Sequence, residues 1–189
     1  TSFTLGFLGQ NDNEIQQGNG FTKGVDVLLQ KSASTWRAWL TYTYQDSQSR
    51  FSTLNEGHYF ASNADIKHSF NLAFNKKWKR FLVTAGWFWH SGKPYSTVNE
   101  AGDVISYNAK RLPDYHRLDV SAVYQFQTAK GNHFKIGVSV YNLYNRHSLL
   151  SKELERQYAN LSDFSNPRYA VREFYSLGMM PNVFFRVAF

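Results

Sequence analysis

The chain has 189 residues and no cysteine, and its 21 lysine and arginine residues against 14 aspartate and glutamate residues give a formal net charge of +7. The lack of cysteine excludes a disulfide framework and a cysteine-based metal site. A mean hydropathy of −0.48 and the lack of an apolar run of about 20 residues exclude a bundle of membrane-spanning helices.

A basic net charge is also typical of nucleic-acid-binding proteins. Here the basic residues are scattered along the chain, with a single cluster at 76–80, and no zinc-finger, helix-turn-helix or RNA-recognition motif accompanies them. We therefore expect no nucleic-acid partner. The chain starts at Thr1 without a methionine or a signal-peptide pattern, which we interpret as a processed start or an internal-to-C-terminal fragment.

About eight segments alternate apolar and polar residues, which is the signature of a β-strand. In chain order they are 2–8, 21–30, 36–45, 66–75, 80–90, 116–126, 134–144 and 176–189. Most have about ten residues, the length that a tilted membrane strand requires. The pattern predicts an all-β protein.

The connections between these segments alternate strictly in length. Tight turns are expected at 31–34, 75–79 and 128–132, and long polar loops at 10–20, 47–64, 91–113 and 146–172. All tight turns then lie at one end of the sheet, as in transmembrane β-barrels with short periplasmic turns and long extracellular loops. A soluble sandwich has no reason to sort its loops in this way.

Aromatic residues on one face of the expected strands are sorted by depth. Those expected near the short turns include Trp36, Trp78, Phe126, Phe185 and Phe189, and those near the long loops include Tyr44, Trp89 and Tyr144. Aliphatic residues lie between the two groups, and two aromatic girdles around an aliphatic belt are typical of a membrane-spanning barrel. The sequence therefore predicts an antiparallel transmembrane β-barrel.

The last segment carries a continuous apolar face, which we expect to contact lipid. Because an open sheet edge is unfavourable in hydrocarbon, this segment is expected to close the sheet, with Phe189 anchoring it at the periplasmic interface. Pro181 lacks a backbone N–H, so we expect a local bulge or bend there.

The opposite face carries charged residues that we assign to the interior of the barrel, where water or a plug can meet them. The principal ones are Arg37, Lys67, Arg117, Asp119 and Arg186. Arg117 and Asp119 stand two residues apart on one face, so they are expected to form a structural pair.

No residue pattern in the chain predicts catalysis, a metal site or a cofactor site. The six histidines show no metal-ligand spacing, and only His90, expected inside near the long loops, is a candidate ligand contact. Within the longest loop, 151–161 is expected to form a short helix capped by Ser151. We expect no enzymatic activity and no cofactor.

Three stretches of the sequence resemble the C-terminal end of TonB-dependent outer-membrane receptors of the Bacteroidetes type. They are RLPDYHRLDVSAVYQF at 111–126, KIGVSVYNLYNR at 135–146 and LGMMPNVFFRVAF at 177–189. The resemblance implies that residues 1–189 form about the last eight strands of one 22-stranded barrel domain, whose plug and N-terminal strands are absent from this chain.

By the same resemblance, the whole receptor imports an extracellular ligand with energy supplied by TonB. This segment would supply barrel wall, extracellular loops and the closing strand, with its C-terminus in the periplasm. The implied partners are outer-membrane lipid and lipopolysaccharide, the N-terminal barrel and plug of the same receptor, and TonB through the missing N-terminal part. A surface lipoprotein is a further candidate partner.

Two other interpretations remain open from the sequence. Eight strands can close alone, so the chain is alternatively a self-contained outer-membrane barrel that serves as an anchor or adhesin. A soluble ligand-binding barrel of the lipocalin type is the third interpretation, although the loop sorting and the double girdle count against it.

Overall fold

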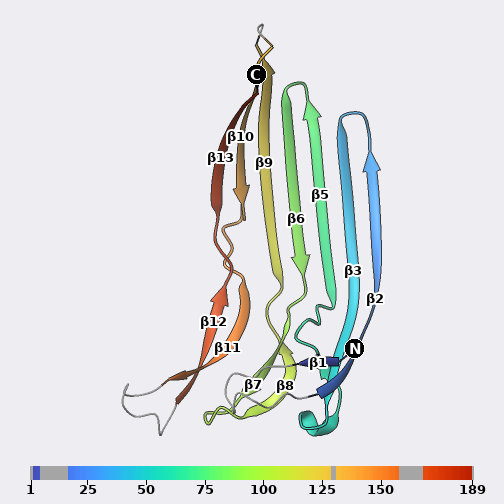
Figure 1. Ribbon diagram of the computed structural model, residues 1–189, viewed down its shortest axis with the longest axis vertical. Coiled ribbons are helices and arrows are strands. Elements are labelled where there is room, and N and C mark those ends of the chain that lie inside the picture. Colours follow the sequence, from blue (N-terminus) through green and yellow to red (C-terminus); the bar gives the residue numbers. More distant parts are fainter. Residues whose placement is uncertain (1, 5–16, 129–130, 158–167, 189) are drawn as a thin grey trace.

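The computed structural model describes residues 2–4, 17–128, 131–157 and 168–188. Most of them lie in antiparallel strands (Figure 1). The strands are β1 (Ser2–Thr4), β2 (Gln17–Ser32), β3 (Trp36–Phe51), β4 (Phe60–Ala61), β5 (His68–Trp78), β6 (Phe81–His90), β7 (Pro94–Val98), β8 (Val104–Arg111), β9 (Tyr115–Gln127), β10 (His133–Tyr141), β11 (Leu149–Gln157), β12 (Arg168–Tyr175) and β13 (Met180–Ala188), and one 3-10 turn spans Asn55–Gly57.

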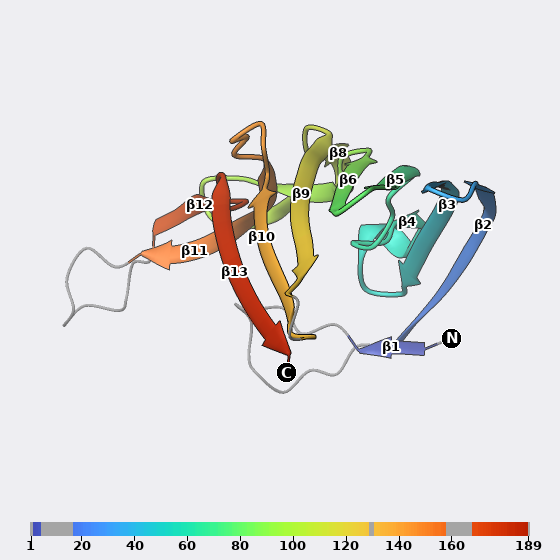
Figure 2. The same ribbon diagram turned by 90° about the horizontal axis from the view of Figure 1, so that it is seen from above.

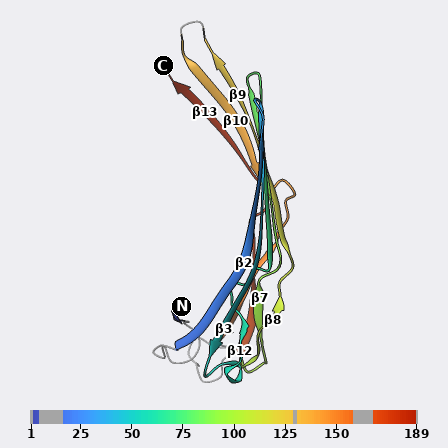
Figure 3. The same ribbon diagram turned by 90° about the vertical axis from the view of Figure 1, so that its right-hand side faces the viewer.

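The main sheet has the order β1-β2-β3-β5-β6-β9-β10-β13, and β4 pairs with the far end of β3. Within the described residues each of the eight predicted strands is present, the first of them only as Ser2–Thr4 because 5–8 lie outside those residues, and the all-β antiparallel prediction is confirmed. Seen from above, the strands follow an open arc, and the sheet bows along its length (Figures 2 and 3). The two edge strands, β1 and β13, do not pair with each other, so the described sheet is not closed.

The tight turns β2–β3, β5–β6 and β9–β10 all lie at one end of the sheet, which we call the short-turn end (Figure 1). The opposite end, the long-loop end, carries two additional hairpins, β7–β8 and β11–β12, each in a sheet of its own. The β5–β6 turn is shorter than the predicted 75–79, since Trp78 pairs with Phe81 and only Lys79 and Arg80 connect the strands.

No helix in the described ranges is long and apolar enough to cross a membrane.

The strand register gives the sheet two chemically different faces, because directly paired residues point to the same side. Leu40, Leu72, Trp87 and Leu118 pair in one row across β3, β5, β6 and β9. The next row, Thr41, Asn71, Phe88 and Arg117, lies on the other side. We call these the apolar face and the polar face. The alternation seen in single segments is thus in phase across neighbouring strands.

The described part of the chain has almost no hydrophobic core. Only Phe51 and Leu112 are buried hydrophobic residues, whereas Val183, Trp78 and Phe185 on the apolar face are 72%, 65% and 62% exposed. Burying such a side chain stabilises a fold by about 1.5–3 kcal/mol, so water is a poor solvent for this face. A lipocalin-type barrel would place its apolar side chains in a closed interior, which this sheet does not have.

The prediction of a helix at 151–161 is wrong for its described residues, because β11 occupies Leu149–Gln157 and pairs with β12. Lys152 lies directly opposite Glu173 and forms an ion pair of 2.8 Å, and Arg172 Nη1 lies 3.5 Å from Glu155. Cross-strand pairs of this kind stabilise a hairpin and override a modest helix propensity. Residues 158–161 lie outside the described residues.

Two details of the C-terminal strand also differ from expectation. The strand β13 begins at Met180 rather than 176, and Pro181 pairs with Val140 in an unbroken register, so the predicted bulge is wrong. Among the described strands β13 pairs with β10 alone, and an edge strand accommodates a proline because one side of it makes no ladder hydrogen bonds. The predicted anchor Phe189 lies outside the described residues.

Candidate functional site on the polar face and in the long loops

The polar face carries a cluster of aromatic and charged side chains near the long-loop end. Its members are Phe88 and His90 of β6, Tyr115, Arg117 and Asp119 of β9, and Tyr141 of β10. They share one face because the register pairs Phe88 with Arg117 and His90 with Tyr115. We call this set the Arg117 cluster.

The guanidinium group of Arg117 is the centre of this cluster. Its Nη1 donates hydrogen bonds to the hydroxyl groups of Tyr115 (3.1 Å) and Tyr141 (2.7 Å). Its Nε donates to Asp119 Oδ2 at 3.0 Å, and Nη2 lies 2.9 Å from the same oxygen. Its central carbon is 4.1 Å from the ring centre of Tyr141 and 4.9 Å from that of Phe88. Arg117 and Asp119 therefore form the pair that their spacing predicted, and two aromatic rings extend it.

The candidate ligand contact His90 belongs to the same cluster. Its ring stacks on Tyr115 with 4.9 Å between ring centres and 13° between planes. His90 Nδ1 lies 2.9 Å from the backbone oxygen of Ser91. The cluster thus presents stacked rings, phenol hydroxyls and a cation on one surface, a combination that can contact planar and anionic ligand groups.

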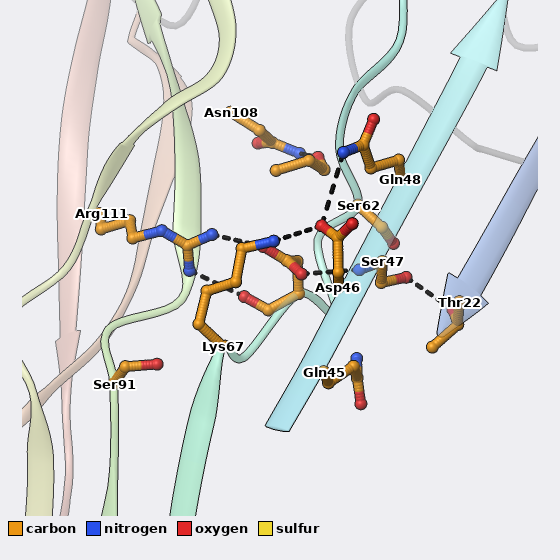
Figure 4. Close-up of polar contacts among 12 residues, drawn as sticks. Thr22, Gln45, Asp46, Ser47, Gln48, Ser62, Lys67, Ser91, Asn108 and Arg111 are labelled. Atoms are coloured by element: carbon orange, nitrogen blue, oxygen red, sulfur yellow. Dashed lines mark hydrogen bonds and ion pairs between the residues drawn. The ribbon is translucent and has the colours of Figure 1, made fainter. Parts of the chain in front are cut away.

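A second polar network joins two long loops at the end of β3 (Figure 4). Asp65 is fully buried and accepts a hydrogen bond from the backbone N–H of Ser47 at 2.7 Å. Its carboxylate also pairs with Arg111 and, at 3.2 Å, with Lys67. Arg111 Nη1 donates to the backbone oxygens of Asp65 and Gly92, both at 2.9 Å. A buried carboxylate needs such partners, so this network fixes the end of β8 against the segment before β5.

Lys67 connects Asp65 to a second carboxylate, that of Asp46, which Lys23 also approaches at 3.4 Å. Asp46 lies beyond 36–45, the part of β3 that the sequence assigns to the membrane. The hydrogen bond from Lys67 holds the pKa of Asp46 below its ordinary value. Lys67 was predicted to lie on the barrel interior, and its two carboxylate partners were not predicted.

Asn108 reinforces the same contact between loops. It is buried with a positive φ of 48°, and its Nδ2 donates to the oxygens of Ala61 and Asn63, both at 2.7 Å. We call the contacts of Asp65, Arg111 and Asn108 the loop staple. Sequence periodicity carries no signal for it, because its members come from loops 45 to 47 residues apart.

The run Tyr141–Arg146, which carries much of the family resemblance, closes the end of β10. Asn142 is 2% exposed with a φ of 53°, a left-handed conformation that asparagine tolerates better than most residues. Its N–H donates to Asp119 Oδ1, and its Nδ2 donates to the oxygens of Arg146 and Leu177, all at 2.9 Å. Asn142 therefore ties the Arg117 cluster to the chain that leads into β13.

Asn145 performs a similar task three residues later. Its φ is also 53°, and its Oδ1 accepts a hydrogen bond of 2.8 Å from the backbone N–H of Met179. The two asparagines of the motif are thus turn and positioning residues, and neither belongs to a catalytic group.

Six of the predicted girdle residues lie on the apolar face by strand register: Trp36, Tyr44, Trp78, Trp89, Phe126 and Phe185. Tyr144 follows the end of β10, Phe189 lies outside the described residues, and the role of these rings at the membrane interfaces stays a prediction. Toward the short-turn end, ring contacts run from Trp78 through Phe81, Tyr124, Phe126 and Phe134 to Phe185, with 4.9–6.5 Å between successive ring centres. Trp36 contacts Phe74 at 6.2 Å. Toward the long-loop end, Tyr44 contacts His68 at 5.4 Å, Trp89 contacts Phe70 at 5.5 Å, and Tyr144 contacts His116 at 5.6 Å.

The remaining predicted interior residues do not join the Arg117 cluster. Arg37 lies on the polar face opposite Ser32 and Asn75, and Arg186 lies opposite Lys135, all toward the short-turn end. No group of three or more histidine, aspartate or glutamate residues in the described ranges has the arrangement of a metal site.

An antiparallel sheet with one apolar and one polar face, aromatic bands at both ends of the apolar face and turns sorted by length defines the wall of a membrane β-barrel. The chain belongs to the TonB dependent receptor-like, beta-barrel family, whose model matches residues 2–143. Comparison with curated proteins gives no significant match, and neither does comparison with solved structures. The family prediction is confirmed, although the match ends within the motif Tyr141–Arg146 and does not reach β13. The family is one of receptors and transporters, not of enzymes.

Proposed function

We propose that this chain is the C-terminal barrel portion of an outer-membrane active-transport receptor that imports an extracellular ligand with energy supplied by TonB. The observation that carries the proposal is the family match over residues 2–143. It agrees with the exposed apolar face of the sheet, which no protein core covers in the described residues. The open edges of the sheet favour the wall of a wider barrel over a self-contained eight-stranded anchor. In this proposal the N-terminal strands and the plug of the receptor complete the barrel.

The short-turn end faces the periplasm in this proposal, and the Arg117 cluster and the long loops face the extracellular side. Arg117, His90 and their aromatic neighbours then line the wall above the plug, where an entering ligand passes. The cations of the polar face at the short-turn end, Arg37 and Arg186, meet water or acidic groups of the plug, since an unpartnered charge is unfavourable in a dry interior. The Bacteroidetes-type origin and a surface lipoprotein partner are parts of the same proposal.

Import is tested in the natural host by comparing a strain that lacks the receptor with its parent. Compounds that the parent removes from a limiting medium and the deletion strain does not are the candidate ligands. Removal of TonB should abolish the same depletion while the receptor stays in the outer membrane. Depletion that continues at the parental rate without TonB would contradict energised transport.

The role of the Arg117 cluster is tested with the compound that this comparison identifies. Arg117→Gln and His90→Ala should weaken its binding to cells at 0 °C, where binding is measured without import. Lys110→Gln, which removes an exposed cation of β8, is the matched control and should leave binding unchanged. Equal binding by all three variants would remove the cluster from the ligand path and leave the transport proposal standing.

A further inference from the structure

Charge is distributed very unevenly between the two ends of the sheet. The short-turn end carries eight described basic residues: Lys31, Arg37, Lys76, Lys77, Lys79, Arg80, Lys135 and Arg186. None of the ion pairs in the described part of the chain involves any of them. The first carboxylate along β2 from this end is that of Asp26, about 17 Å from Lys31 at 3.4 Å per residue.

These cations divide between the two faces. Those on the polar face would meet water or the plug and are part of the proposed receptor. Lys76 belongs to the apolar face, because it pairs directly with Trp36 on one side and with Val83 on the other. Lys31 shares that face, since it pairs with Ala38. Lys79 and Arg80 form the adjoining turn.

A cation on the lipid-facing side of a barrel is costly at mid-bilayer and nearly neutral at the interface. Lys76 lies beside Trp36, and the turn Lys79–Arg80 lies between Trp78 and Phe81. Aromatic rings of this kind sit at the level of lipid headgroups. The ammonium and guanidinium groups therefore reach the depth of the phosphates.

Among the described residues the side chain of Arg80 makes one long hydrogen bond, from Nη1 to the hydroxyl group of Tyr124 at 3.5 Å, which leaves its other donors for a ligand. On the lipid-facing side, Lys76 and the turn stand beside the rings of Trp36, Trp78 and Phe81. Basic groups beside apolar rings fit a phosphodiester with the glycerol and acyl chains attached to it.

We propose that the short-turn end binds the headgroup of an anionic phospholipid, of the phosphatidylglycerol class, through Lys76, Lys79 and Arg80. The proposal rests on the membrane placement in the proposed function, with the short turns in the periplasm, and it adds a lipid partner of stated charge in the periplasmic leaflet. Charge complementarity selects an anionic over a zwitterionic headgroup, and the aromatic neighbours select a lipid over a free phosphate ion.

The complete receptor, purified in detergent, is titrated with phosphatidylglycerol and with phosphatidylcholine, and bound lipids are counted by native mass spectrometry. The wild type should retain phosphatidylglycerol on the order of tenfold more strongly, as expected for a few basic residues at an anionic surface. Lys76→Gln combined with Lys79→Gln should remove most of this preference, and Arg80→Gln alone should reduce it.

The control is Lys93→Gln combined with Lys110→Gln, which removes the same charge from exposed positions at the long-loop end and should keep the preference. Each variant is first shown to be folded by the heat-dependent shift of its electrophoretic mobility. Equal retention of both lipids by the wild type, or an equal loss in the control pair, would overturn the proposal. Displacement of phosphatidylglycerol by millimolar inorganic phosphate would also overturn it, since the site would then recognise the anion and not the lipid.

The result of the lipid-binding experiment can be told apart from the result of the transport test. TonB-dependent uptake without a lipid preference would refute only the lipid site. A lipid preference without TonB-dependent uptake would refute active transport and leave the lipid site established.

Discussion

Replacing Asn142 should loosen the junction between β10 and β13 more than any other single change in the motif Tyr141–Arg146. The side chain donates two hydrogen bonds, to the oxygens of Arg146 and Leu177. Losing two such bonds costs about 2 kcal/mol. Alanine at a φ of 53° costs about 1 kcal/mol more, because a β-carbon is unfavourable in the left-handed region.

The sum for Asn142→Ala is about 3 kcal/mol, or on the order of a hundredfold rise in local opening at about 1.4 kcal/mol per factor of ten. Asn142→Gly loses the same hydrogen bonds without the backbone cost, so its opening should rise roughly thirtyfold. The glycine variant thus separates the two contributions.

The assay is amide hydrogen exchange of the peptide 141–146 in the detergent-purified receptor, since exchange there reports local opening. The backbone N–H groups of Leu143 and Asn145 are the reporters, and they bind the oxygens of Leu118 and Asn142 at 2.7 and 2.8 Å. Asn55→Ala is the control, because Asn55 also has a positive φ but lies in a distant loop. A change of less than about threefold in Asn142→Ala would show that these bonds do not hold the junction.

Three other predictions concern topology, the two faces and pH. Single cysteines at Ser32 and Asn99, probed on intact cells with an impermeant maleimide, should label only at Asn99, and labelling at Ser32 alone would invert the topology. Val138→Arg on the apolar face should lower the free energy of unfolding in lipid by about 2–4 kcal/mol near mid-bilayer. Ser139→Arg on the polar face should change this free energy little, and equal losses in the two variants would contradict the assignment of faces. The pKa of Asp46 is lowered, so its contribution to stability is present above its ordinary pKa of 3.8 and is lost as the pH falls through the lower value in the folded protein. Because Asp46 is joined through Lys67 and Asp65 to Arg111 at the end of β8, proteolysis within the β7–β8 hairpin by an acid-active protease should accelerate below about pH 4. The variant Asp46→Asn should show accelerated proteolysis already at neutral pH.

The sequence predicts the strands and their faces well because both depend on local alternation. A period of two places Leu40 and Thr41 on opposite sides whatever their partners are, and lipid favours apolar residues at the outward positions between the two interfaces. The pair Arg117 and Asp119 was predictable for the same reason, since two residues along a strand share a face.

What the sequence did not predict depends on contacts between distant segments. The loop staple brings Asp65 to Arg111, 46 residues away, and no period describes such a contact. The segment 151–161 has helix-forming residues, but pairing with β12 supplies cross-strand partners that outweigh local propensity. Asn142 was noticed only as part of a family motif, because its role depends on carbonyl oxygens of segments that fold around it.

The long loops also contact one another through their hairpins. Lys152 of β11 lies 5.4 Å from the ring centre of Tyr95 in β7, and Tyr169 of β12 packs against Gly102 at the tip of the β7–β8 hairpin. Together with the loop staple, these contacts join segments far apart in the sequence into one continuous surface.

In the proposed topology that surface lies at the cell exterior, where an antibody or a bacteriophage meets it first. Its epitopes are discontinuous, since each patch combines residues from separate loops. Antibodies raised against the folded receptor should therefore lose recognition when the protein is boiled in detergent, and antisera raised against single loop peptides should bind intact cells poorly.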